Sequence, residues 1–361
     1  MFLSIREIRK AGSRFALIGS VTVLITLLIV MLTGLTNGLG KQNTGALESL
    51  NPDKIAFVSP SSTSEPEVSF TNSAVSDEAL NSWRAVEGVE KAIPLGVSQT
   101  RLESEHAAEP GALLALPEGT EFAGGTVGDG AVLSAELARK LQVGTGDVIT
   151  LGGQEASVVG VVDAPEGAVS NYYSHSPVAW VDTHTWQQAA HTEAVGTVVL
   201  LTVDSHAGDL AVPKHSVVTG LKGSFAGLAA YSSEQGSLRS MQGFLYAISA
   251  LVTISFLTVW TMQRTRDIAV LRAIGASRRY VLIDALTQSA IILGVGSFLG
   301  AVLGWAAGWA VQSTGTVPFH SDWQTVAAPA VGVFLLGLIG SLIAVRTVSK
   351  VNPLLALGAA Q

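Results

Sequence analysis

Cysteine is absent from the 361 residues, and charged side chains are scarce, at 14% of the chain. Without cysteine, any exported part cannot rely on disulfides and must fold on its own hydrophobic core. Only 14% charge beside 48% hydrophobic residues excludes an ordinary soluble domain. A GxxxxGK[ST] loop is also missing, so the chain lacks the usual cradle for nucleotide phosphates and we expect no ATP hydrolysis by this chain alone.

Four apolar windows are each long enough to cross a membrane, since a hydrocarbon core of about 30 Å takes roughly 20 helical residues. They are residues 15–40, 240–263, 281–311 and 323–345. The first is too long for the apolar part of a signal peptide, so we interpret it as a retained anchor. The expected fold is an α-helical membrane protein with four transmembrane helices plus a mixed α/β extracytoplasmic domain inserted between helices 1 and 2.

Lysine and arginine predict the orientation, because short cytoplasmic segments hold these residues back from translocation. They gather in residues 1–14, 264–280 and 346–361. We therefore expect both termini in the cytoplasm of a bacterial cell, the protein in its plasma membrane, and residues 41–239 and the turn 312–322 outside. The segment 41–239 has a net charge of −14 and the remainder +7, which supports this division.

Residues 41–239 have the pattern of a folded α/β domain. Ser76 and Ser134 each precede a helical pattern and are predicted N-caps, with Glu136 in the first turn after Ser134. A Gly-Gly pair at 152–153 separates two alternating strands, and PVAWVD and TVVLLTV also read as strands. The run from 131 to 167 is typical of a small β-barrel module.

Neither a metal site nor an enzyme is favoured by the polar residues. The histidines lie at 106, 175, 184, 191, 206, 215 and 320, all on the predicted outer side. His184 and His191 lack the i,i+4 spacing of a zinc helix, which favours scattered solvated histidines. Ser134 has no GxSxG setting, and AGGTVGDG lacks the strand and helix of a dinucleotide site. We expect no catalytic residue, no metal and no permanently bound cofactor.

Residues 264–280 predict a short basic amphipathic helix between the second and third windows. Its apolar stripe consists of Ile268, Leu271 and Ile274. Gly275 is expected to end this helix and Ser277 to cap the next one. Two hypotheses fit the pattern: the helix docks into a groove of a cytoplasmic partner, or it lies on anionic lipid with its arginines among the headgroups.

The sequence RDIAVLRAIGASRRYVLIDAL, residues 266–286, resembles the signature of the FtsX and MacB superfamily of ABC transporter permeases. The order of segments is similar as well: a basic arm, one span, a large exported domain, three further spans and a short tail. VNPLLALGA at 351–359 resembles the motif that ends these permeases, and residues 134–162 resemble the small barrel of their exported domain.

This resemblance implies that residues 264–280 carry a coupling helix that docks into an ATPase subunit. The implied coupling residues are Arg266, Asp267, Ile268, Leu271, Arg272, Ile274 and Gly275. It also implies a homodimer with two copies of a cytoplasmic ABC ATPase, which would bind ATP and Mg²⁺; no nucleic acid is expected as a partner. The start of the chain would lie on membrane lipid as an elbow helix, with Ile5, Ile8 and Phe15 facing the lipid.

The exit of the first span, 32–50, and the entry of the third, 284–290, are most similar to the compact Hrt-type permeases that export haem. The resemblance makes haem the expected transported ligand, taken sideways from the bilayer between the first two spans of two protomers. Haem iron takes Tyr, Met or His ligands, and its propionates pair with Arg or Lys. The candidates are Tyr231, Arg239, Met241, Tyr246 and Met31. Interfacial tyrosines, a span-ending arginine and packing methionines are the alternative interpretation.

Two other functions stay open. The protein could resemble FtsX in mechanotransmission, where ATP hydrolysis moves the exported domain to activate an extracellular cell-wall hydrolase and no substrate crosses. It could instead export a peptide antibiotic or a lipid-linked molecule.

Overall fold

The structure is a computed structural model that describes residues 12–61, 64–122, 125–162, 171–206, 209–263, 270, 274, 275, 277–314 and 317–348. The chain divides into two compact units. The helical unit comprises Met1–Gly38 and Gly236–Gln361, and the sheet domain comprises Leu39–Gln235. The predicted elbow helix and the tail beyond residue 348 lie outside the described residues, apart from the first residues of the first long helix.

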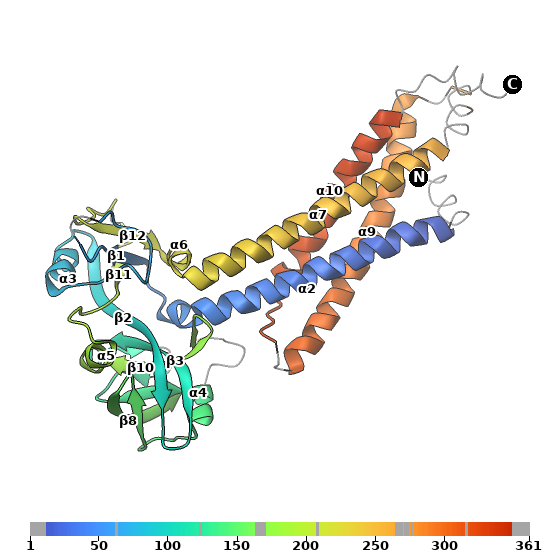
Figure 1. The fold of residues 1–361 in the computed structure, drawn as a ribbon. Coiled ribbons are helices and arrows are strands. Elements are labelled where there is room, and N and C mark those ends of the chain that lie inside the picture. The colour runs from blue at the N-terminus through green and yellow to red at the C-terminus, as the bar shows by residue number, and fades with distance from the viewer. Residues whose placement is uncertain are drawn as a thin grey trace. The chain divides into compact units, whose positions relative to one another are not determined.

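Within the described residues, four helices are long and apolar enough to cross a membrane. Figure 1 labels each of them. They are α2 (Gly12–Leu50), α7 (Ala229–Gln263), α9 (Arg278–Thr314) and α10 (Trp323–Val348). The expected fold class, four spans with an α/β domain after the first, is confirmed. All four helices are longer than their apolar windows, and α2 and α7 the most: α2 continues to Leu50 and α7 begins at Ala229. Polar turns there extend the backbone hydrogen bonding beyond the apolar part.

Glycines bring α9 against α2 in the helical unit. A Cβ atom at Gly296 would stand 2.9 Å from Thr22 Cβ, and one at Gly304 would stand 2.9 Å from Val30 Cβ. Residues four apart share one face of a helix, so these glycines form a groove along α9 that receives α2. In a membrane, where lipid is as apolar as leucine, such close van der Waals contact is a main source of helix association.

Helix α10 contacts both α9 and α7. Leu293 of α9 fills the space beside Gly337, and Ile254 of α7 fills the space beside Gly340. Buried Ser341 of α10 also donates a hydrogen bond of 2.8 Å to Ser289 of α9. Small residues of α10 therefore allow its contacts with α9 and α7.

The turn before α10 folds back onto α2. Phe319 lies where a Cβ at Gly34 would be, and the Pro318 carbonyl lies where a Cβ at Gly38 would be. The His320 backbone N–H donates to the Gly34 carbonyl at 3.1 Å. Glycine at both α2 positions is what allows the turn to sit this closely.

The sheet domain is built on one long twisted sheet with helices on its surface. Its first strands and helix are β1 (Lys54–Val58), α3 (Asp77–Arg84), β2 (Val89–Glu103), β3 (Ala108–Leu116), β4 (Glu121–Phe122), β5 (Gly125–Thr126) and β6 (Ala131–Ser134). They are followed by α4 (Ala135–Leu141), β7 (Val148–Leu151), β8 (Gln154–Val162), β9 (Tyr172–Tyr173), β10 (Ser176–Asp182) and α5 (Thr183–Ala190). The last are β11 (Val198–Val203), β12 (Ser216–Gly220), α6 (Leu221–Ser224) and the short 3-10 turn η1 (Phe225–Gly227).

The strand order is β12-β1-β11-β2-β3-β10-β6-β8-β7, and β7 pairs again with β2. The second pairing, with Leu102 opposite Leu151, closes six strands into a barrel. The start of β2 pairs with β11 and its end with β3, so this one strand belongs to both halves of the sheet. The barrel expected around residues 131–167 is thus completed by β2, β3 and β10, which lie outside that run.

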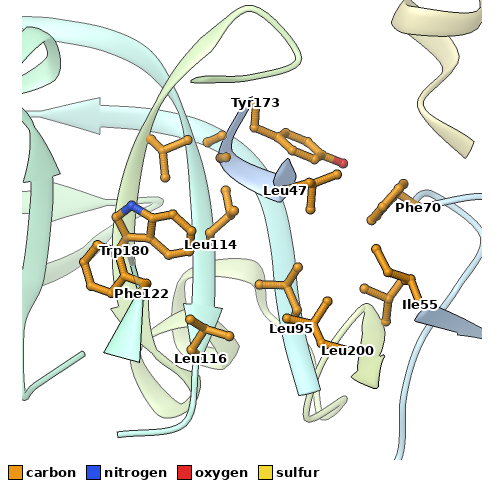
Figure 2. Close-up of a cluster of buried hydrophobic side chains, with 14 of the residues drawn as sticks. Leu47, Ile55, Phe70, Leu95, Leu114, Leu116, Phe122, Tyr173, Trp180 and Leu200 are labelled. Carbon is orange, nitrogen blue, oxygen red and sulfur yellow. The ribbon is translucent and has the colours of Figure 1, made fainter. Parts of the chain in front are cut away.

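The largest core of the domain receives the end of α2. Leu47 of that helix is fully buried and belongs to one cluster with Ile55, Leu95 and Trp180. Figure 2 shows Leu47 beside the ring of Tyr173 within this cluster. The last turns of the first long helix are therefore a core element of the sheet domain.

The local signals in the sequence are confirmed. Ser76 caps α3 by accepting a hydrogen bond from the Ala79 N–H, and Ser134 caps α4 by accepting one from the Leu137 N–H. Both glycines of the Gly-Gly turn between β7 and β8 have positive φ, +58° at Gly152. Each signal depends on contacts within a few residues, which is why the sequence alone indicates it.

Candidate functional site

The predicted coupling segment is described only at residues 270, 274 and 275 and from Ser277 onward. Arg266, Asp267, Ile268, Leu271 and Arg272 lie outside the described residues.

At Ile274 the backbone N–H donates to the Val270 carbonyl at 3.1 Å, and the side chain is 80% exposed. Gly275 has φ +108°, a conformation that suits glycine after a helical turn. Ser277 Oγ accepts from the Tyr280 N–H at 3.1 Å, just before α9 begins. The predicted cap at Ser277 is confirmed, and the coupling helix and its role stay predictions.

An uncovered stripe runs along α7. Its residues recur every three or four positions and are exposed. They are Met241, Phe244, Ile248, Leu251, Ser255, Val259 and Met262. Of the proposed haem ligands, Met241 lies on this stripe with 54% of its surface exposed. We call these seven residues the α7 stripe.

The other haem candidates lie elsewhere. Arg239 is exposed on α7, and Met31 is half-buried on α2. Tyr246 is half-buried, with its hydroxyl 3.1 Å from where a Cβ at Gly332 of α10 would stand. Tyr231 belongs to the sheet domain, where its ring stacks edge-on against Phe225 at 5.7 Å.

Within α7, Met241 and Tyr246 point to different sides of the helix, because five residues turn it by roughly 140°. Tyr231 packs against the largest core of the sheet domain. Met241 is therefore the candidate ligand with open apolar surface around it.

One polar contact inside the helical unit was not predicted. Gln242 of α7 donates from Nε2 to the hydroxyls of Thr36 at 3.2 Å and Thr33 at 3.5 Å on α2. These hydroxyls donate in turn to the Leu32 and Ile29 carbonyls, each at 2.7 Å. A glutamine within an apolar window is the signal that could have indicated this contact.

The sheet domain holds a second unpredicted cluster. Asn43 of α2, Glu234 of α7 and His175 of the turn between β9 and β10 meet through their side chains. His175 thus departs from the expected scatter of solvated histidines, whereas His206, with a side chain 91% exposed, fits it. In the described ranges no group of three or more His, Cys, Asp or Glu side chains is placed to hold a metal ion.

Both units match known families. Residues 17–211 match the model of the MacB-like periplasmic core domain, and residues 240–353 match that of the FtsX-like permease C-terminal. The chain belongs to the FtsX/MacB family of ABC transporter permeases.

The permease is similar in sequence to other permeases over their whole lengths. It is 23% identical, over all of both chains, to a protein of Staphylococcus epidermidis named putative hemin transport system permease protein HrtB. It is 24% identical, over 99% of each chain, to an uncharacterized ABC transporter permease of Mycobacterium tuberculosis. Among solved structures, the extracellular domain of the ABC-type transporter YknZ covers 42% of this chain and 84% of its own, at 18% identity and a TM-score of 0.31.

The sheet domain of the permease is accordingly the extracytoplasmic domain of this family, placed after the first of four spans. The family is that of a transporter subunit and brings no catalytic domain, and its ABC type implies a partner ATPase.

Proposed function

We propose that the permease is the membrane subunit of an ATP-driven efflux pump that exports haem from the membrane and so relieves haem toxicity. The observation that carries this proposal is the similarity to the permeases named for hemin transport, which extends over all of both chains. It therefore includes the spans and the sheet domain together, and is not confined to a shared module.

A separate cytoplasmic ATPase subunit drives this pump. Two copies of it bind a permease homodimer, and each copy binds ATP and Mg²⁺. In support, the sequence has no phosphate-binding loop of its own. The coupling segment at 266–275 then docks into the ATPase from the cytoplasmic side, where both termini also lie. Arg272 and the other basic residues of this segment pair with carboxylates of the partner, and Leu271 fills its groove.

The part of the α7 stripe around Met241, with Phe244 and Ile248, is the proposed haem-binding surface. Binding to such a surface is favourable for a flat apolar macrocycle, because it removes apolar surface from water or lipid headgroups. The Met241 thioether can serve as an iron ligand. Arg239, two residues earlier, provides the charge for a propionate. Tyr231, Tyr246 and Met31 stay candidates, although Tyr231 and Tyr246 are engaged in packing within their own units.

The test is a haem titration of purified permease in lipid nanodiscs, followed by the Soret absorption band. We expect a saturable shift that is weakened in Met241→Ala. Met262→Ala is the matched control, because Met262 is an exposed methionine at the other end of the same stripe and should leave the shift intact. Tyr231→Phe and Tyr246→Phe are measured beside them.

No shift beyond that of empty nanodiscs would overturn haem as the substrate. The permease would then export a peptide or lipid-linked molecule, or transmit motion to an extracellular hydrolase. A normal shift in Met241→Ala, lost in one of the tyrosine variants, would move the ligand to that tyrosine.

A further inference from the structure

The turn between β9 and β10 docks onto α2 through its backbone. Ser174 and His175 both have left-handed backbone conformations, with φ +48° and +63°. Their N–H groups donate to the carbonyls of Asn43 and Gln42, each at 3.1 Å. The tip of a tight hairpin is thereby fixed to the side of a helix that also serves as a membrane span.

The Glu234 carboxylate holds the same turn to α7. Its Oε1 lies 2.7 Å from His175 Nε2, and its Oε2 accepts from Asn43 Nδ2 at 3.0 Å. Asn43 is fully buried, and its Nδ2 also donates to the Leu39 carbonyl at 3.1 Å. Because the Glu234 carboxylate and the Leu39 carbonyl can only accept, the amide nitrogen and not the oxygen must face them.

This arrangement includes two unfavourable features, a buried acceptor without a partner and left-handed backbone at two residues. Their presence favours a role for the contact. Within the part of the chain that the structure describes, no donor reaches Asn43 Oδ1, and a buried acceptor without a partner lowers the stability of the folded state. Left-handed backbone at Ser174 and His175 is also unfavourable for residues other than glycine. Glycines would form the turn without that strain, but glycine at 175 would remove the imidazole that reaches Glu234.

Of the three elements joined here, the turn leads directly into the barrel, because β10 follows it. Strand β10, which follows the turn, pairs with β3 over five residues, from Val178 to Asp182, and with β6 on its other side. Tyr173, just before the turn, is buried and stacks edge-on against Phe70. At Gly40, a Cβ would meet Gln235 of α7 at 3.2 Å, so α2 and α7 also touch directly beside the cluster.

We propose that Asn43, His175 and Glu234 form a clamp that makes the outer ends of α2 and α7 and the barrel move as one body. These are positioning residues of the transport cycle. The clamp rests on the proposed function as an ATP-driven permease, in which movement of the spans must reach the extracytoplasmic domain. A directional, charge-assisted contact fixes the angle between the elements, which apolar packing alone would leave free to slide.

The test uses the full-length permease together with its ATPase, and takes advantage of the absence of native cysteine. Nitroxide labels go on Ser157→Cys in β8 and Ser233→Cys in α7, both exposed positions of the sheet domain. Pulsed electron paramagnetic resonance then gives the distribution of distances between them. The double variant His175→Asn with Glu234→Ala breaks the clamp while asparagine, which tolerates left-handed backbone, keeps the turn.

We expect the distance distribution to be narrow in the parent and broad in the double variant, and haem moved per ATP hydrolysed to fall roughly fivefold or more. Ser174→Gly is the matched control, since it relaxes the same turn and leaves the side-chain clamp untouched. Glu234→Gln keeps the shape of the side chain but loses its charge. Its distance distribution should be broader than that of Ser174→Gly and narrower than that of the double variant.

An unchanged distribution in both the double variant and Glu234→Gln would overturn the clamp. If the parent protein moves no haem, but its distribution broadens when the clamp is broken, the clamp stands and haem export fails. The two proposals are thus tested separately by one set of variants.

Discussion

Gly300 of α9 lies so close to Val23 of α2 that a Cβ atom at Gly300 would stand 2.5 Å from the Val23 carbonyl oxygen. No side chain fits there unless the two helices separate. The close approach of α2 to α9 is therefore set by the absence of a side chain at this position and at Gly296 and Gly304 in the same groove.

Gly300→Ala is expected to destabilise the permease by about 1–3 kcal/mol, because the methyl group overpacks the contact between α9 and α2. Gly243→Ala is the matched control: a Cβ there meets no atom within 4 Å, and alanine favours the helix. Thermal unfolding in detergent measures both. Equal melting temperatures for the two variants would show that α2 and α9 do not approach this closely.

Leu47→Ala is expected to cost about 2–5 kcal/mol of stability in the sheet domain, since this fully buried side chain fills the core that Figure 2 shows. Leu24→Ala makes the same change in the same helix at a side chain that is 56% exposed, and should leave the domain unchanged. Amide hydrogen exchange of the sheet strands reports the difference. Undiminished protection in Leu47→Ala would contradict a structural role for the end of α2.

Leu271→Asp combined with Arg272→Glu is expected to abolish co-purification of the permease with its ATPase, because the change puts negative charge into the proposed docking stripe. Lys350→Glu, a charge reversal in the tail, should leave the complex intact. The measurement is the amount of ATPase recovered with tagged permease. A double variant that still co-purifies and pumps would assign docking to another segment.

Asp322 caps α10, and its pKa is lowered by hydrogen bonds from the side chain and backbone of Thr325. A carboxyl whose folded pKa lies below its unfolded value of about 3.9 adds stability above that pH and loses it as the pH falls through the folded pKa. Asp322→Asn, which also caps helices, should flatten this acid dependence at little cost near neutrality. Asp322→Ala should lose about 0.5–2 kcal/mol near neutral pH, and less in acid, where the carboxyl of the parent protein is protonated.

Unfolding measured from neutral pH down to about pH 2 separates the two variants. An acid dependence unchanged in Asp322→Asn would show that other carboxylates account for it.

The predictions that held were those whose physical cause is local. Ser76 and Ser134 cap helices through partners three residues away, and Ser277 does the same before α9. The four apolar windows indicated spans because bilayer thickness sets a length that any helix must meet. The sequence also carried the family, since the match depends on the order of segments as much as on residues 266–286.

By itself the sequence therefore determined the membrane class, the order of the spans, the local caps and the family. Only the tertiary structure decided which distant residues meet. His175 and Glu234 are 59 positions apart, Asn43 and Glu234 are 191 apart, and the strand pairing that closes the barrel joins Leu102 to Leu151. Such contacts produce no periodic pattern in the sequence, because they depend on how the sheet twists and where each helix ends. Those features are fixed only when the whole core packs together.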